Sequence, residues 1–398
     1  MTVARGIQQA LQHSSWIRRM FEAGVALKAQ VGEDGVFDFS LGNPILEPPQ
    51  VLQQALRELT AHPPPGLHRY MPNAGFPSTR RAVAHHLSQQ EGVDLDLEDV
   101  VMTVGAAGAL HVALRSILDP GNEVIVFAPY FVEYPSYIEA QGGRPVLVET
   151  GPDFDLDLEA LARAVTGRTK AVLVNTPNNP TGRIYSQGRI DALGEVLGAA
   201  ERRHGTTIYV LSDTPYAQLT YDGLKNPRFF TAHPSTLLAH SFSKDLGLAG
   251  ERIGLLAISP RAPYREDLRR ATIYNNRVLG FINAPSLMQL ALERSLGATV
   301  DLGYYRDLRE RLCGGLVAAG YRLSPPQGSF YVFPETPEPD DVAFCARLLK
   351  HNVLVVPGSG FGRAGHMRIA FCVKPQTVEG ALPHFAAALR EAQAERAS

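Results

Sequence analysis

One lysine of the sequence stands among groups that bind phosphate. Lys244 follows Ser241 and Ser243, Arg252 lies a short way beyond within residues 250–254, and an apolar run at 237–240 leads into the segment. A lysine amine forms Schiff bases with aldehydes, and hydroxyl and guanidinium groups donate the hydrogen bonds that a phosphate dianion accepts. The segment therefore predicts a lysine that binds a phosphorylated aldehyde covalently, as lysines do with pyridoxal phosphate.

A carboxylate and a phenol follow one of the predicted strands. Asp213 comes just after the strand expected at 207–211, and Tyr216 follows within the same turn. Parallel sheets bind ligands at the carboxyl ends of their strands, and a carboxylate there would keep a facing pyridine nitrogen protonated. Taken alone, Asp213 is more simply interpreted as the cap of the next helix.

Two turns of small or turn-forming residues follow other predicted strands. Asn179 comes after the strand at 171–174, and its amide could donate to a ring oxygen that Tyr216 shares. Gly105, Ala106 and Ala107 follow the strand at 100–104 and open a helix, where backbone N–H groups and the helix dipole suit a phosphate. Both kinds of turn are also common without any ligand.

An aromatic residue and a buried arginine complete the candidate residues. Phe131 lies just beyond the strand at 123–127, where it could stack on a flat ring, although core packing is the ordinary alternative and Tyr130 fits the same spacing. Arg368 lies within the apolar strand expected at 367–371, where an unpaired guanidinium would be costly. A carboxylate ligand or an internal salt bridge would satisfy it equally well.

The elements that must position these residues alternate between apolar strands and helical segments. Helical stretches such as 156–165 and 190–203 separate strands expected at 100–104, 123–127, 145–149, 171–174, 207–211, 237–240 and 253–258. Continuous apolar strands of this kind indicate an α/β fold, with a large lobe in which helices cover a mostly parallel seven-stranded sheet.

The remaining chain is expected to form a smaller α+β lobe. A mostly helical stretch at 286–317 precedes short strands at 330–333, 353–356 and 367–371, and residues 37–41 could add a strand from the N-terminal segment. A chain of 398 residues exceeds the roughly 250–300 that one core usually serves, so two lobes are expected. The predicted division is 1–48 together with 285–398 for the small domain, and 49–284 for the large domain.

Composition excludes several other classes of protein. A net charge of −2 with both signs evenly spread favours neither nucleic acid nor an anionic membrane as a partner. The histidines show no metal-binding spacing, so no metal is expected, and no Gly-x-Ser-x-Gly nucleophile motif of serine hydrolases is present.

The cysteines and the N-terminus favour a cytoplasmic protein. Three cysteines lie far apart, without the pair spacings of zinc or redox sites, which is typical of buried thiols in a reducing compartment: Cys313, Cys345 and Cys372. Polar residues stand where a signal peptide would have its apolar segment, namely Arg5, Gln8, Gln9 and Gln12.

Taken together and in this order, the motifs resemble the fold type I, pyridoxal phosphate-dependent aminotransferases of the aspartate aminotransferase-like superfamily (class I/II aminotransferases). The resemblance extends from the run Leu-Gly-Asn-Pro at 41–44 to the strand with Arg368. Each motif is weak by itself, but five of them in the correct order are a strong signal.

The resemblance implies a role for each candidate residue. Lys244 is similar to the Schiff-base lysine and Asp213 to the partner of the pyridinium, while Asn179 and Tyr216 resemble the pair on the ring oxygen. Phe131 matches the ring-stacking aromatic. The phosphate ligands would be Gly105, Ala106, Ala107, Ser241, Ser243 and Arg252.

The substrate and the partner subunit also have counterparts in the resemblance. Arg368 and the backbone at Gly42 match the positions that hold the substrate α-carboxylate, with Asn179 beside them. Tyr70 resembles the tyrosine that reaches the phosphate of a neighbouring subunit, which implies a homodimer. Two departures are Thr214, where many relatives have Glu, and Arg277, which has no secure match to the arginine that selects a second carboxylate.

The activity that the resemblance implies is ping-pong exchange of an amino group between an L-amino acid and a 2-oxo acid. The same lysine and aspartate would equally serve a C–S β-lyase, an oxidase or a cyclase. A non-catalytic regulator that binds the cofactor is a further alternative, but such proteins carry a DNA-binding domain ahead of this one, and residues 1–48 leave no room for it.

Overall fold

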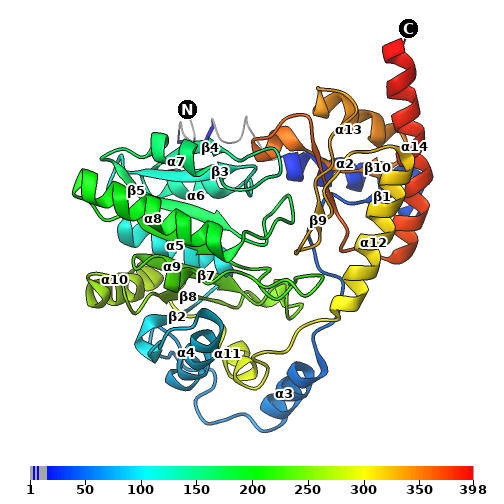
Figure 1. Cartoon of the computed structure of the whole chain (residues 1–398). Coiled ribbons are helices and arrows are strands. Elements are labelled where there is room, and N and C mark those ends of the chain that lie inside the picture. Colours follow the sequence, from blue (N-terminus) through cyan, green and yellow to red (C-terminus); the bar gives the residue numbers. More distant parts are fainter. Residues whose placement is uncertain (1–2, 5–6, 9–15, 398) are drawn as a thin grey trace.

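Seven strands form the central sheet of the computed structural model, which describes residues 3–4, 7–8 and 16–397 (Figure 1). Their order is β2-β8-β7-β6-β5-β3-β4, and only β8 runs antiparallel to its neighbours. The strands are β2 (Val100–Thr103), β3 (Glu123–Ala128), β4 (Arg144–Glu149), β5 (Thr169–Asn175), β6 (Tyr209–Asp213), β7 (Thr236–Ser241) and β8 (Gly254–Ile258). The predicted mostly parallel seven-stranded sheet is confirmed.

Alternate residues of the strands are buried on opposite faces of the sheet. In β3, Val124 and Val126 pack in one cluster with Leu110 of α5 (Gly105–Ile117), while Ile125 and Phe127 pack in another with Ile190 of α8 (Gln187–His204). Because both faces of β3 are buried, its interior is apolar throughout, which explains why a strand of this kind was recognisable in the sequence.

Helices cover both faces of this sheet (Figure 1). The helices of this lobe are α3 (Gln50–Ala61), α4 (Pro77–Glu91), α5 (Gly105–Ile117), α6 (Tyr134–Ala140), α7 (Leu158–Ala164), α8 (Gln187–His204), α9 (Phe229–Ala232), α10 (Arg265–Val278) and α11 (Ser286–Glu293), of which α3 and α11 pack mainly on other helices.

The C-terminal part builds a second core around two small sheets. One sheet has the order β11-β12-β9, from Val356–Pro357, Met367–Ala370 and Tyr331–Val332. In the other, β1 (Phe37–Asp38) pairs in parallel with β10 (Val353–Leu354). The helices here are α2 (Trp16–Val31), α12 (Leu302–Ala319), α13 (Asp341–Lys350) and α14 (Pro375–Ala397).

The β1–β10 pair joins the N-terminal segment to the C-terminal region, far away in sequence. On this pairing we propose that both belong to one small domain, with the large domain beginning near residue 49. The helical stretch expected at 286–317 is two helices, and α11 packs against α3 and α4 of the large lobe. We therefore place the second boundary between α11 and α12.

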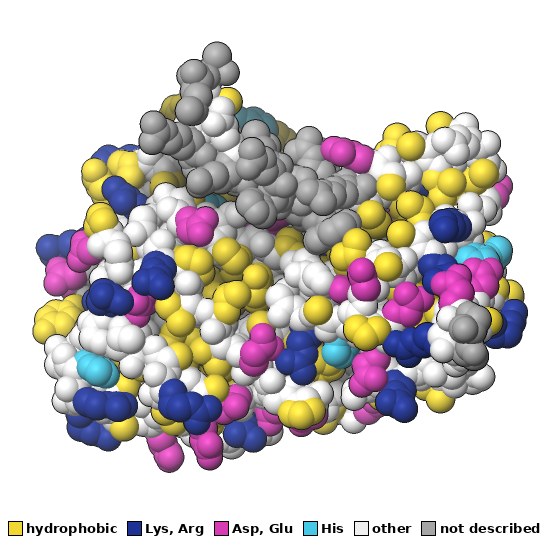
Figure 2. Space-filling view, turned by 90° about the horizontal axis from the view of Figure 1, so that it is seen from above, with side chains coloured by type: hydrophobic (Ala, Val, Ile, Leu, Met, Phe, Trp, Pro, Cys, Tyr) yellow, Lys and Arg dark blue, Asp and Glu magenta, His cyan; other side chains and the backbone are white. Residues whose placement is uncertain are grey.

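Charges of both signs are interspersed over the face seen in Figure 2, outside the parts drawn in grey. Among the described residues, no helix combines the length and apolar character needed to cross a membrane. Arg5, Gln9 and Gln12, on which the expectation about a signal peptide partly rests, lie outside the described residues.

Candidate active site

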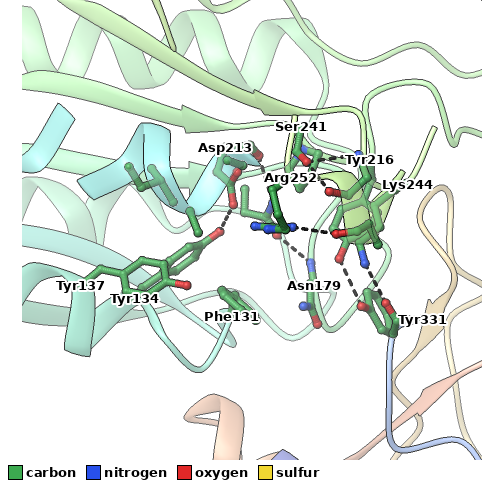
Figure 3. A pocket seen from close by; sticks show the side chains of 18 of the residues that line it. Phe131, Tyr134, Tyr137, Asn179, Asp213, Tyr216, Ser241, Lys244, Arg252 and Tyr331 are labelled. Atoms are coloured by element: carbon green, nitrogen blue, oxygen red, sulfur yellow. Dashed lines mark hydrogen bonds between the residues drawn. The ribbon is translucent and has the colours of Figure 1, made fainter. Parts of the chain in front are cut away.

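A pocket of about 340 Å³ lies where the carboxyl ends of the parallel strands face the C-terminal region (Figure 3). Asn175, Asp213 and Ser241 are the last residues of β5, β6 and β7, and the C-terminal region adds Tyr331 and Arg368. The lining is Gly42, Ala106, Ala107, Leu110, Phe131, Tyr134, Tyr137, Asn175, Asn179, Asp213, Pro215, Tyr216, Ser241, Ser243, Lys244, Ala249, Arg252, Tyr331 and Arg368.

The lysine of the pocket is held by the N-terminal segment. Lys244 Nζ donates to the backbone carbonyl of Gly42 at 2.7 Å and lies 5.5 Å from the centre of the Phe330 ring. Burial, with the cations of Arg368 and Arg252 nearby, lowers the pKa of Lys244 to about 8. A substantial fraction of its amine is therefore neutral near physiological pH, as a nucleophile or base requires.

Asp213 presents one free carboxylate oxygen. Its Oδ2 accepts a hydrogen bond from the Tyr134 hydroxyl, whereas Oδ1 has no hydrogen-bond partner among the described residues. Burial raises the pKa of Asp213 to about 6, although the Tyr134 hydrogen bond and the charge of His240 act in the opposite direction. An unsatisfied buried carboxylate oxygen calls for a cationic N–H donor in the pocket.

Hydroxyls, a guanidinium and a helix start converge at another part of the pocket. Ser241 Oγ and Ser243 Oγ are 2.6 Å apart, and helix α5 begins at Gly105 with Ala106 and Ala107 on the lining. Gly105 has φ +75°, and a Cβ there would lie 2.8 Å from Arg252 Nη2, so glycine is needed. This donor set is the one that a phosphate group accepts.

Arg368 is a buried cation whose partners leave it incompletely satisfied. Its Nη2 donates to the Ser40 carbonyl at 2.6 Å and its Nη1 to Asn179 Oδ1 at 3.2 Å, but Nε has no partner among the described residues. The rings of Tyr331 and Phe361 lie 4.7 and 4.8 Å from the guanidinium carbon. A guanidinium held this firmly with a free Nε can bind a carboxylate.

Gly42 lies close to Tyr331. A Cβ at Gly42 would lie 1.8 Å from the Tyr331 hydroxyl oxygen, so no other residue fits without displacing the tyrosine. That hydroxyl is also 3.1 Å from the Tyr216 hydroxyl. The two phenols thus connect the N-terminal segment to the loop after Asp213.

Comparison with known proteins agrees with this geometry. A family model described as aminotransferase class I and II matches residues 34–385. The chain belongs to this family. It is a pyridoxal phosphate-dependent aminotransferase, an enzyme that exchanges amino groups between amino acids and 2-oxo acids.

Two curated relatives show the breadth of the family. The aspartate/prephenate aminotransferase of Thermus thermophilus is 34% identical, over 88% of this chain and 90% of its own length. The aromatic-amino-acid aminotransferase 2 of Thermococcus litoralis is 30% identical, over 95% of this chain and 96% of its own.

Solved structures match over nearly the whole chain. An aminotransferase from Eubacterium rectale gives a TM-score of 0.95 at 35% identity, covering 98% of this chain and 99% of its own. The aspartate aminotransferase of Thermus thermophilus with maleate gives a TM-score of 0.86 at 30% identity, covering 98% and 100%.

The residues of this aminotransferase fit its cofactor. The free Oδ1 of Asp213 suits a protonated pyridine nitrogen, and the donors at Ser241, Ser243 and Arg252 suit a phosphate. Within the described part of the chain, no cluster of three or more histidine, cysteine, aspartate or glutamate residues is arranged to hold a metal ion.

Most of the predicted site residues meet in this one pocket, with two exceptions. Gly105 is not on the lining itself, although it borders Arg252. Tyr70 does not line the pocket of its own chain, since its side chain is 92% exposed. Phe131 lines the pocket, whereas Tyr130 lies in a different one.

Several lining residues of the aminotransferase were not anticipated, among them Tyr134, Asn175 and Tyr331. Asn175 Nδ2 donates to the Asp213 carbonyl at 2.9 Å, and its Oδ1 accepts from the Asn179 N–H at 2.7 Å. Its place at the end of β5 was a usable signal, because polar strand ends face the ligand edge of a parallel sheet. Tyr134 and Tyr331 carried no such signal.

Proposed function

We propose that Lys244 is the residue that binds the cofactor and moves the proton during amino-group exchange. Pyridoxal phosphate, when bound, supplies an electron-withdrawing ring that stabilises negative charge at the substrate α-carbon. Lys244 Nζ, neutral in part because burial lowers its pKa to about 8, would accept the α-proton and pass a proton to the cofactor carbon within the same half of the exchange. In the other half it would act in the reverse direction and protonate the α-carbon of the product. The observation that carries this proposal is one buried amine in a pocket with Asp213 and Arg368.

The other residues of the pocket would orient the cofactor and bind its charged groups. Asp213 would face the pyridine nitrogen through its free Oδ1, and Asn179 with Tyr216 would donate to the ring oxygen. Phe131 would stack on the ring. The phosphate would lie among Gly105, Ala106, Ala107, Ser241, Ser243 and Arg252.

Arg368 would hold the α-carboxylate of the substrate. Its guanidinium is buried against the rings of Tyr331 and Phe361, and Nε has no partner among the described residues, so a two-pronged contact with a carboxylate is supported. The backbone at Gly42 would complete this contact. A fixed carboxylate places the α-carbon at one position relative to Lys244, which is how binding contributes to rate.

We also propose a donor with an uncharged side chain. Among the described lining residues the cations are Lys244, Arg252 and Arg368, and each has a role above. The wall beyond them is largely apolar or aromatic, with Leu110 and Pro215. Arg277 is exposed, lies 5.6 Å from the Tyr274 ring centre and is not on the lining.

The active unit is proposed to be a homodimer in which Tyr70 reaches the partner's pocket. Tyr70 is 92% exposed, yet the turn that follows it is fixed by hydrogen bonds. Asn73 Nδ2 donates to the Ile282 carbonyl at 3.1 Å, and Asn283 Nδ2 donates to the Pro72 carbonyl at 2.9 Å. A fixed turn that projects an aromatic side chain into solvent supports a contact with a second copy.

A cytoplasmic location is part of the same proposal. The three cysteines are free and buried, as thiols are in a reducing compartment.

The decisive experiment supplies the purified chain with pyridoxal phosphate and a panel of amino acids without any acceptor. Transamination predicts one equivalent of 2-oxo acid per site and conversion of the cofactor to pyridoxamine phosphate. Release of pyruvate and a thiol from cystathionine would instead indicate β-lyase chemistry. In the Lys244→Ala variant, the borohydride-trapped cofactor adduct should disappear; an adduct on another lysine would refute the assignment.

Within that panel, phenylalanine and methionine should convert the cofactor with a higher kcat/KM than aspartate does. Arg277→Ala provides the control and should leave the ratio of kcat/KM for aspartate to kcat/KM for phenylalanine within about twofold, since that arginine is not on the lining of its own chain's pocket. A preference for aspartate that Arg277→Ala removes would contradict the proposed substrate class.

A further inference from the structure

His240, on β7 just before the lysine segment, connects the two loops that carry the central residues of the pocket. Its Nδ1 lies 2.8 Å from the backbone carbonyl of Thr214, the residue after Asp213. Its Nε2 lies 3.3 Å from Asp245 Oδ2, on the residue after Lys244. The ring is buried and packs edge-on against Phe242, with the ring centres 4.8 Å apart. His240 is not on the lining of the pocket itself.

Both ring nitrogens of His240 face hydrogen-bond acceptors. A backbone carbonyl only accepts, and an ion pair with a carboxylate needs a charged ring, so the hydrogen bond to Thr214 and the ion pair with Asp245 together require a proton on both nitrogens. A neutral imidazole has one N–H and would leave one contact unmade. The geometry therefore selects the imidazolium form.

The charge of His240 acts on Asp213 across adjacent strands. Asp213 pairs with Ala239, the neighbour of His240, in the register of β6 and β7. Burial raises the pKa of Asp213, and the His240 cation lowers it again. Burial opposes the charge of His240 itself, but Asp245 and the Thr214 carbonyl outweigh burial and raise the pKa of His240 above its ordinary value.

The other ionisable groups around His240 come from neighbouring elements. His86 of α4 lines the same small cavity as His240 and Asp245. Ser295, from the segment after α11, also lines this cavity, but its hydroxyl is not ionisable in this pH range. A second hollow that His240 also lines has Glu91, Lys225 and Arg228 on its wall. In the described structure, only Asp245 among these ionisable groups is paired with the ring of His240.

We propose that His240 is a positioning residue of this aminotransferase: as a cation it connects the turn that follows Asp213 to the turn that carries Lys244, and it holds Asp213 in its charged form. The inference rests on the proposed role of Asp213 toward the pyridine nitrogen. Asp245 is its necessary partner, because it keeps His240 charged in a buried place.

The test is the pH dependence of pyridoxal phosphate binding to the full-length chain after removal of the cofactor. The dissociation constant is measured between about pH 5 and about pH 8, the range in which histidine and a raised aspartate titrate. For the wild type, affinity falls as acid protonates Asp213. In His240→Gln, which is neutral, Asp213 takes up its proton more readily, so the fall should begin about one pH unit higher. On the acid side, binding should then be about tenfold weaker than in the wild type.

Asp245→Asn provides a second, independent variant. It removes the anion that keeps His240 charged, so it should shift the fall in affinity in the same direction. The double variant should shift no further than His240→Gln alone, because both changes remove the same cation. His86→Asn, which alters the same cavity without touching either loop contact, should leave the curve unchanged.

A purely structural role for His240 gives a different result. The variants would then bind pyridoxal phosphate more weakly by the same factor at every pH. Their melting temperatures would also be lower, which would attribute the weaker binding to loss of folded protein. That outcome, or a double variant whose shift is the sum of the single shifts, would overturn the inference. Turnover of amino acids by the wild type tests the proposed function separately. The role of His240 is tested only by the difference in pyridoxal phosphate affinity between the variants and the wild type.

Discussion

The hydroxyl of Tyr134 donates a hydrogen bond to Oδ2 of Asp213, although Tyr134 follows one strand of the sheet, Asp213 ends another, and the two residues lie far apart in the sequence. Tyr134 begins α6 after β3, and Asp213 ends β6. The bond occupies one oxygen of the carboxylate and leaves Oδ1 without a hydrogen-bond partner among the described residues. It also lowers the pKa of Asp213 against the effect of burial.

Tyr134→Phe should therefore weaken cofactor binding while the fold is kept. A hydrogen bond to a charged group contributes about 1.5–3 kcal/mol, so the pKa of Asp213 should rise by about one to two units. Asp213 would then be largely protonated near neutral pH, and pyridoxal phosphate affinity should fall most strongly on the acid side. Titration of the cofactor at several pH values measures this. Tyr130→Phe, outside the pocket, is the matched control, and an equal effect in both variants would show that the bond does not matter.

The lowered pKa of Lys244 gives a second prediction. In the cofactor-free chain, Lys244 is an ammonium below about pH 8 and a neutral amine above it, because burial, followed by Arg368 and Arg252, disfavours the charge. An amine-selective reagent should therefore modify Lys244 with a midpoint near pH 8, well below the value of about 10.4 for an ordinary lysine. Mass spectrometry of the peptide with Lys244 gives its rate beside those of the other lysines. A midpoint equal to theirs would show that burial leaves this amine unperturbed.

The sheet could be predicted from the sequence because each of its strands is marked by a short run of apolar residues. Except for the edge strand β4, the strands are buried on both faces, so a run such as Val124 to Phe127 is apolar throughout and stands out from the helices. The polar residues at strand ends, Asp213 among them, then had to lie at one edge. The motifs near Lys244 and Asn179 could be located for the same reason.

The contacts that set the chemistry of the site could not be predicted in this way. Tyr134 and Asp213 are 79 positions apart, and nothing near either one indicates the other. Tyr331 lies against Gly42 only because the C-terminal region folds over the N-terminal segment. The bridge from His240 to Thr214 and Asp245 likewise depends on the register of β6 and β7.

Arg368 offers a test of substrate binding that separates it from cofactor binding. Removing one partner of a buried, hydrogen-bonded charge pair costs about 2–5 kcal/mol, so Arg368→Gln should lower kcat/KM for every amino acid by on the order of 100-fold. The affinity for pyridoxal phosphate should stay within about twofold, because the free Nε of Arg368 is proposed to bind the carboxylate and not the cofactor. A primary amine without a carboxylate is the control substrate, and its slow reaction should not change. If kcat/KM for the amine falls as much as kcat/KM for the amino acids, Arg368 affects the structure of the pocket and does not bind the carboxylate.

Tyr70 provides a prediction that only a dimer can fulfil. If Tyr70 serves the pocket of the other subunit, a chain with Tyr70→Ala retains a complete Lys244 pocket that lacks only the partner's tyrosine. A chain with Lys244→Ala has a dead pocket but can still supply its Tyr70. A dimer with one chain of each kind therefore contains one native pocket.

Mixing the two weak variants in equal amounts, with exchange of subunits, should thus restore activity. Random pairing makes half of the dimers mixed, and each has one native pocket of two, so about a quarter of the wild-type activity per site should return. If Tyr70 acts in its own chain, neither pocket of the mixed dimer is complete and nothing is recovered. Mixing Lys244→Ala with Asp213→Ala is the negative control, because both changes lie on the pocket lining of their own chain and no mixed dimer can repair them.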